Sequence, residues 1–290
     1  MSDKTFERVN TGLVLLITFI ILYPLIFVLS ASISDPTAIV LGKMWLWPVD
    51  ITWDGYRQVF ENRLIWSGYK NTIIYTTLGT LLHLFILLPG AYALSRRELM
   101  FKKLFLWFVI FTMLFNGGII PTFIVVKELG MLNTMWAIII PGVIGAWAIL
   151  VAKSFFEQNI PEQLVEAAKI DGSSDIYLFF RIVLPLSLPI IAVMALFHAV
   201  AVWNQYLNAL IYLRDDALYP LQLVLRNILV VSQMAAESTG GISSSFGDQL
   251  KMAELVKYAV IIVSALPLLV VYPFLQRFFI QGVLIGSVKE

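Results

Sequence analysis

Six long runs without charged residues are the strongest constraint on the fold of this chain. Each run lacks Asp, Glu, Lys and Arg over 19 residues or more: Val9–Ser34, Asn71–Ser95, Leu104–Val126, Leu129–Ala152, Ile182–Leu213 and Tyr258–Gln276. About 20 apolar residues cross the hydrocarbon core of a membrane as an α-helix. The sequence therefore predicts an all-α integral membrane protein, in which residues 1–290 form one transmembrane domain of six helices.

The composition agrees with a membrane location and argues against several functions. Apolar residues make up 59% of the chain and charged residues only 13%, against about 25% charged in a typical soluble domain. The net charge of +1 gives no basic excess for nucleic-acid binding. Without cysteine, with two isolated histidines and without a Walker A phosphate loop, we expect no enzyme activity, metal site or cofactor in this chain.

A charged stretch from Lys153 to Arg181 separates the fourth and fifth runs. Its eight charged residues would each cost roughly 2.5–3.5 kcal/mol at the centre of a bilayer helix, so the stretch lies in water. Pro161 suits the first turn of a short helix, and Gly172 suits a left-handed C-terminal cap. In this helix Ala167 and Ala168 either are simply good helix formers or leave a surface that another protein's backbone can approach.

A second short helix is expected directly after the first. Ser173 or Ser174 can cap its N-terminus, and Leu184-Pro185 is expected to end it. Its apolar residues recur at spacings that place them on one side: Ile176, Phe179, Phe180 and Val183. Asp171 opposes the dipole of the first helix, so it serves either the next helix or a cation outside the chain.

The same residues resemble, in order and spacing, the EAA loop of ABC-importer membrane subunits: Glu166-Ala167-Ala168, Asp171-Gly172, Phe179, Ile182 and Leu184-Pro185. Ser173 stands where this family often has alanine. The resemblance implies a type I ABC-importer permease fold and a coupling loop over residues 153–183. It also implies that a separate cytoplasmic ATPase docks on the first helix, with Glu166, Ala167, Ala168, Asp171, Gly172 and Pro185 as ATPase-coupling residues.

The orientation follows from lysines and arginines, which gather in cytoplasmic loops. The short turn Ser95–Lys103 contains four of them: Arg96, Arg97, Lys102 and Lys103. With this turn inside, six helices place both termini and residues 153–183 in the cytoplasm of a multi-pass inner-membrane protein. Residues 35–70 and 214–257 are then extracytoplasmic, and we expect the apolar part Leu218–Met234 to form a helix against the bundle or the membrane surface.

Polar residues are rare inside the runs, and such groups usually face a bundle interior or a cavity. Trp203, Asn204, Gln205 and Tyr206 combine hydrogen-bonding groups with aromatic faces in one long run. They are candidates for the substrate pathway, although a structural hydrogen bond between helices explains them at least as well. His83 and His198 are interpreted as packing residues.

Two further regions resemble the maltose-type carbohydrate permeases, especially those for polysaccharide fragments. They are residues 197–210, with Trp203-Asn204, and the tail 276–289. Ile285-Gly286-Ser287 and Glu290 differ from the common tail pattern. The likeness covers nearly the whole chain. It implies a permease subunit of an oligosaccharide importer, with a second permease, two copies of an ATPase that bind ATP and magnesium, and an extracytoplasmic solute-binding protein.

Three other functions fit the sequence less well than an oligosaccharide importer. For an ABC importer of another small solute, only the carbohydrate-type features of the sequence argue against it. A proton-coupled secondary transporter would normally need a carboxylate inside the membrane, and none of the six runs contains one. A passive channel would have no use for the elaborate charged loop.

Overall fold

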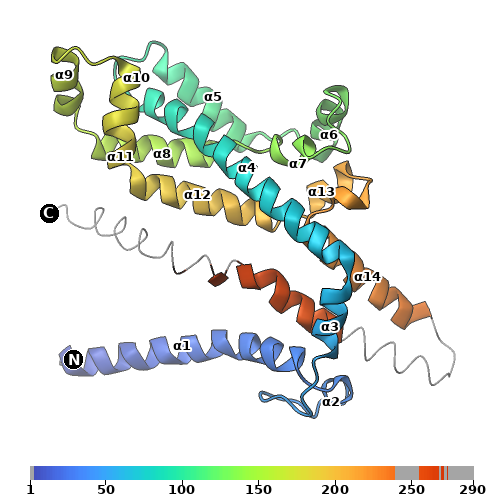
Figure 1. Cartoon of the computed structure of the whole chain (residues 1–290). Coiled ribbons are helices and arrows are strands. Elements are labelled where there is room, and N and C mark those ends of the chain that lie inside the picture. The colour runs from blue at the N-terminus through green and yellow to red at the C-terminus, as the bar shows by residue number, and fades with distance from the viewer. Residues whose placement is uncertain (1–2, 239–254, 268, 271–272, 274–290) are drawn as a thin grey trace. The chain divides into compact units, whose positions relative to one another are not determined.

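In a computed structural model the chain is described over residues 3–238, 255–267, 269, 270 and 273 (Figure 1). Helices and turns make up these residues, and no strand occurs among them. Two units can be distinguished: one within residues 1–66 and 224–267, the other mainly residues 67–223. The all-α prediction is confirmed, while one transmembrane domain and six crossings stay predictions.

The first unit contains α1 (Asp3–Ser32), α2 (Pro36–Val40), α3 (Asp54–Glu61) and a helix over Leu255–Pro267. The first predicted run is thus one continuous helix. Ser30 at its end donates to the carbonyl of Leu46 at 2.7 Å, and Ser34 accepts from the amide of Val49 at 3.2 Å. These bonds fix the loop that follows α1.

Close packing inside this unit explains one glycine. A Cβ atom on Gly55 of α3 would lie 2.9 Å from the carbonyl oxygen of Leu255. Only glycine lets the two helix backbones approach this closely. Residues 268, 271, 272 and 274–276 of the sixth predicted run lie outside the described residues, as do the C-terminal tail and residues 239–254 of the second extracytoplasmic segment.

The second unit is built on α4 (Arg63–Ser95), a helix of 33 residues. This helix contains the whole second predicted run and begins earlier, at Arg63. Its first turns also bind the segment after α13: Asn71 donates to the carbonyls of Ala217 and Tyr219, and Thr72 accepts from the amide of Leu221. Where the helix Leu218–Met234 was predicted, the structure has α14 (Leu221–Ser238), which belongs to the first unit from Val224 on.

Two predicted runs are broken where one continuous helix was expected. The third run forms α5 (Lys102–Leu114) and α6 (Ile119–Glu128), which are bent by 114°. Gly118 between them has φ +81°, a conformation that favours glycine. The fourth run forms α7 (Trp136–Ile139) and α8 (Ala146–Asn159), so α8 extends into the charged stretch.

The fifth run is also interrupted, and the predicted role of Pro185 as a helix end is wrong. After α10 (Asp175–Leu178) the chain makes a π-helical turn, Phe179–Val183, and continues through α11 (Leu184–Leu186). Pro185 lies in the first turn of α11, where a missing N–H costs little. The bend comes at Ser187, where α12 (Leu188–Trp203) turns away by 80° before α13 (Leu207–Tyr212).

By length and composition, two described helices can cross a membrane, the span Lys4–Ser32 within α1 and α4. The number rises to four if each bent pair is one span. One of those pairs contains the fifth run up to Trp203 and joins the charged stretch directly to α12. The break at Ser187 therefore lies between the water-exposed loop and the apolar helix that follows.

Candidate functional site

The first predicted short helix of the charged stretch is α9, Glu162–Ile170. Pro161 has ψ 140° and precedes the first helical residue, so it stands one position before the predicted first turn. At the other end Gly172 has φ +77°. The amide of Ser173 donates to the carbonyl of Ala168 at 2.9 Å, and that of Gly172 to Lys169 at 3.0 Å. The predicted glycine cap is confirmed as a Schellman motif.

An apolar inner face holds α9 in place. Val165 is 2% exposed and Ala168 is 7% exposed, and both belong to a core with Phe156 of α8 and Leu178 of α10. The two alanines therefore do not form one open surface, as the sequence suggested. Ala168 is packed inward because it lies three residues from Val165 on the same helix face.

The opposite face of α9 is open. Glu166 and Ala167 are exposed, and Ile170 is 86% exposed. No ion pair of Glu166 occurs among the residues that the structure describes. An acidic group, a residue with a minimal side chain and an apolar side chain thus stand together on a short helix, free to meet a partner.

Two oppositely charged neighbours in the turn between α4 and α5 hold the two ends of α9. Arg97 pairs with Glu162 at 3.1 Å, and Glu98 pairs with Lys169 at 2.8 Å. Glu162 and Lys169 each also oppose the partial charge of their own helix end. The hydrogen bond from Lys169 lowers the pKa of Glu98 and raises that of Lys169. Both ion pairs can form only when the N-terminus of α9 lies beside Arg97 and its C-terminus beside Glu98.

The same turn is attached to α8 through Glu157. Glu157 accepts from Lys102 at 2.9 Å and from Lys153 at 2.6 Å, and Lys102 also donates to the carbonyl of Ser95. Burial acts to raise the pKa of Glu157, but these two lysine hydrogen bonds outweigh it and lower the pKa. A polar cavity of about 500 Å³ lies beside the start of α9 and is lined by Arg97, Glu157 and Glu162 among others.

Asp171 does not cap the next helix, which was the one partner inside the chain that its position suggested. The N-terminus of α10 is capped by Ser174, whose hydroxyl accepts from the amide of Tyr177 at 3.3 Å. Asp171 is exposed, and the described part of the chain holds no ion pair to it. Its carboxylate remains available to a group outside this chain.

The pathway candidates divide between a cavity and the core. Asn204, Gln205 and Tyr206 line a cavity of about 360 Å³ at the end of α12. Trp203 is 6% exposed and packs against the ring of Tyr69, with centroids 6.5 Å apart. The structure thus brings three of the four predicted residues to one cavity and excludes the fourth from it.

His198 also lines this cavity, and sequence reasoning missed it. Its ring stacks on that of His83, with centroids 4.2 Å apart and planes 5° from parallel, while Nδ1 of His83 is 2.6 Å from the carbonyl of Val143. The two histidines are far apart in sequence, in α4 and α12, so no spacing pattern signals the pair.

The fold and the loop define a class of protein: a helical membrane protein whose short solvent-exposed helix is fastened by a core and two ion pairs. Residues 65–285 match the family described as the binding-protein-dependent transport system inner membrane component. The chain belongs to this family. It is therefore a transport-system permease of the inner membrane rather than an enzyme, and its system includes a substrate-binding protein and ATPase partners.

Relatives and a solved structure match the chain over almost its whole length. It is 42% identical to the polygalacturonan/rhamnogalacturonan transport system permease protein YtcP of Bacillus subtilis, with 100% of both chains covered. It is 41% identical to protein LplC of Bacillus subtilis, covering 93% of this chain and 90% of LplC. A crystal structure of a bacterial ABC transporter involved in the import of the acidic polysaccharide alginate has a chain with TM-score 0.84 and 34% identity, covering 96% of this chain and 98% of that one.

The ion pairs across α9 yield a prediction for a charge exchange. Arg97→Glu places a carboxylate beside Glu162, and we expect the amides of α9 to exchange hydrogen about two- to fivefold faster, because exposed ion pairs are individually weak. The double variant Arg97→Glu/Glu162→Arg should restore the slow rate. Arg57→Glu, which breaks an exposed pair with Glu61 on α3, serves as a control. Equal exchange in the single and double variants, measured by mass spectrometry, would contradict the pairing.

Proposed function

We propose that this chain is one of two permease subunits of a type I ABC importer for oligosaccharides. In this assembly it has six transmembrane spans and both termini in the cytoplasm. A second, similar permease completes the pathway, and two copies of an ATPase bind ATP and magnesium. Each ATPase is expected to dock on one helix of the α9 type. Because this chain has a single α9, the second ATPase needs a second permease.

The observation that carries the proposal is the open face of α9 on a rigidly held helix. Val165 and Ala168 fasten its inner side, and the pairs of Arg97 and Glu98 fasten its ends. Force applied at Glu166, Ala167 and Ile170 would then move the whole helix rather than bend it. This is the property that a helix docked on a nucleotide-driven ATPase requires, and Asp171 and Gly172 at its end belong to the same docking region.

The movement has a direct route to the cavity at the end of α12. Ala168 and Phe179 belong to one core, so a shift of α9 acts on the π-helical turn, on Pro185 in α11 and on the bend at Ser187. Rotation at this bend would swing α12, whose far end carries Asn204 and Gln205 at the cavity. We propose that this cavity is part of the substrate pathway.

An oligosaccharide is the substrate class that the relatives support. YtcP is named for polygalacturonan and rhamnogalacturonan transport, and another relative, 29% identical, is the melibiose/raffinose/stachyose import permease protein MelC of Bacillus subtilis. The cavity at α12 offers amide and hydroxyl groups from Asn204, Gln205, Asn208 and Tyr206. Such groups suit a ligand rich in hydroxyls, because each can both donate and accept hydrogen bonds.

Reversing the charge on the open face of α9 tests the coupling role. In the reconstituted complex, Glu166→Lys should reduce ATPase stimulation by the loaded binding protein about tenfold, because the new charge lies in a central contact. Glu61→Lys, an exposed charge reversal on α3, should leave stimulation unchanged. An assembled Glu166→Lys complex with normal stimulation would contradict the coupling role.

Removing an amide from the cavity tests the pathway. Gln205→Ala should lower the initial rate of oligosaccharide uptake about tenfold while the complex still assembles, because a polar contact to substrate is lost. Gln158→Ala removes an amide that bonds only Ser154 on the same helix and provides the matched control. If both variants transport at the rate of the unchanged protein, Gln205 does not lie on the pathway.

A further inference from the structure

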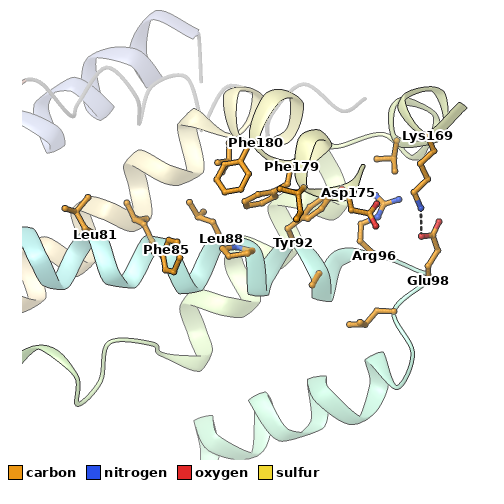
Figure 2. Close-up of a pocket in the computed structure, with 17 residues that line it drawn as sticks. Leu81, Phe85, Leu88, Tyr92, Arg96, Glu98, Lys169, Asp175, Phe179 and Phe180 are labelled. Carbon is orange, nitrogen blue, oxygen red and sulfur yellow. Dashed lines mark hydrogen bonds and ion pairs between the residues drawn. The ribbon is translucent and has the colours of Figure 1, made fainter. Parts of the chain in front are cut away.

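A second cavity, of about 720 Å³, lies in the unit that contains α4 and the charged loop. Figure 2 shows its apolar part between one side of α4 and the helix from α10 to α11. Leu88 and Phe179 form its buried floor, while Phe85 and Phe180 stand at its sides with 75% and 58% of their surface exposed. It is therefore an open groove with an apolar lining, and its floor is part of the core that holds α9.

One end of this groove is charged. Lys169 and Glu98 neutralise each other there through their ion pair. Arg96 and Asp175 lie beside them (Figure 2), and neither forms an ion pair among the described residues. The guanidinium of Arg96 lies over the face of Tyr92, 5.8 Å from the ring centroid. The charged end thus offers one cation and one carboxylate that lie outside the ion pairs of the described residues.

The length of the groove matches one leaflet of a membrane. Leu81, Phe85, Leu88, Tyr92 and Arg96 follow one face of α4 at helical spacing. From Leu81 to Tyr92 the apolar part rises about 16 Å, and half of the hydrocarbon core is about 15 Å thick. An acyl chain along the apolar part would therefore place its headgroup at Arg96 and Asp175.

We propose that this groove binds one phospholipid with a phosphoethanolamine headgroup. The phosphate accepts hydrogen bonds from the guanidinium of Arg96, and the ammonium donates to the carboxylate of Asp175. One acyl chain lies between Phe85 and Phe180. A purely anionic headgroup would leave Asp175 facing a negative charge, and a trimethylated ammonium has no hydrogen to donate.

The bound lipid would rest against both α4 and the segment that links α9 to α12. It would contact Phe179 and Phe180 of the π-helical turn, the region through which α9 is proposed to act on α12. Its placement in the cytoplasmic leaflet rests on the proposed orientation of the loop. The binding itself does not depend on transport, so the two proposals can fail separately.

Native mass spectrometry of the assembled complex, exchanged into defined lipid mixtures, tests the site. We expect phosphatidylethanolamine to be retained at least fivefold more than phosphatidylcholine or phosphatidylglycerol. Arg96→Gln and Asp175→Asn should each abolish this preference. Arg97→Gln, the neighbouring arginine that pairs with Glu162 outside the groove, should preserve it. Equal retention of the three lipids, or equal loss in Arg96→Gln and Arg97→Gln, would overturn the proposal.

Crosslinking identifies the occupant of the groove directly. A benzophenone side chain introduced at position 85 in the full complex, reconstituted with phosphatidylethanolamine, should crosslink to this lipid on illumination. Crosslinks to the second permease instead would assign the groove to a subunit interface and refute the lipid site. Complex assembly, checked by size-exclusion chromatography, ensures that the variants are compared as folded proteins.

Discussion

The attachment of α9 to the rest of its unit is the constraint on which the structure of the charged loop depends. A helix of nine residues is too short to be stable by itself in water. Val165 and Ala168 supply the apolar contact, and the pairs from Arg97 and Glu98 fix the direction of the helix. The exposed pairs add little stability. Their contribution is orientation, because reversing α9 would bring like charges together.

The same attachment links the loop to the membrane helices along two routes. One route passes from Ala168 through the shared core to Phe179, the π-helical turn and the bend at Ser187. The other passes from Glu162 and Lys169 through the charged turn to α4 and α5. A π-helical turn followed by a break favours helix motion, since its hydrogen bonding is already irregular.

Local signals predicted the loop well and the membrane helices less well. Gly172 and the Ser174 cap act within a few residues, so the sequence was sufficient to place the end of α9 and, to within one residue, the start of α10. Composition identified the apolar runs, but it could not reveal the breaks at Gly118 and Ser187, because an apolar run looks the same whether straight or bent. The inward position of Ala168, the burial of Trp203 and the stacking of His83 on His198 depend on contacts between distant segments.

The central claim is that the open face of α9 lies in the cytoplasm and meets an ATPase. Because the sequence has no cysteine, Ile170→Cys introduces a single thiol at a position that is 86% exposed. A membrane-impermeant maleimide should label it in inside-out vesicles and not in right-side-out vesicles, and bound ATPase should protect it. Labelling from the outside of intact right-side-out vesicles would contradict the account.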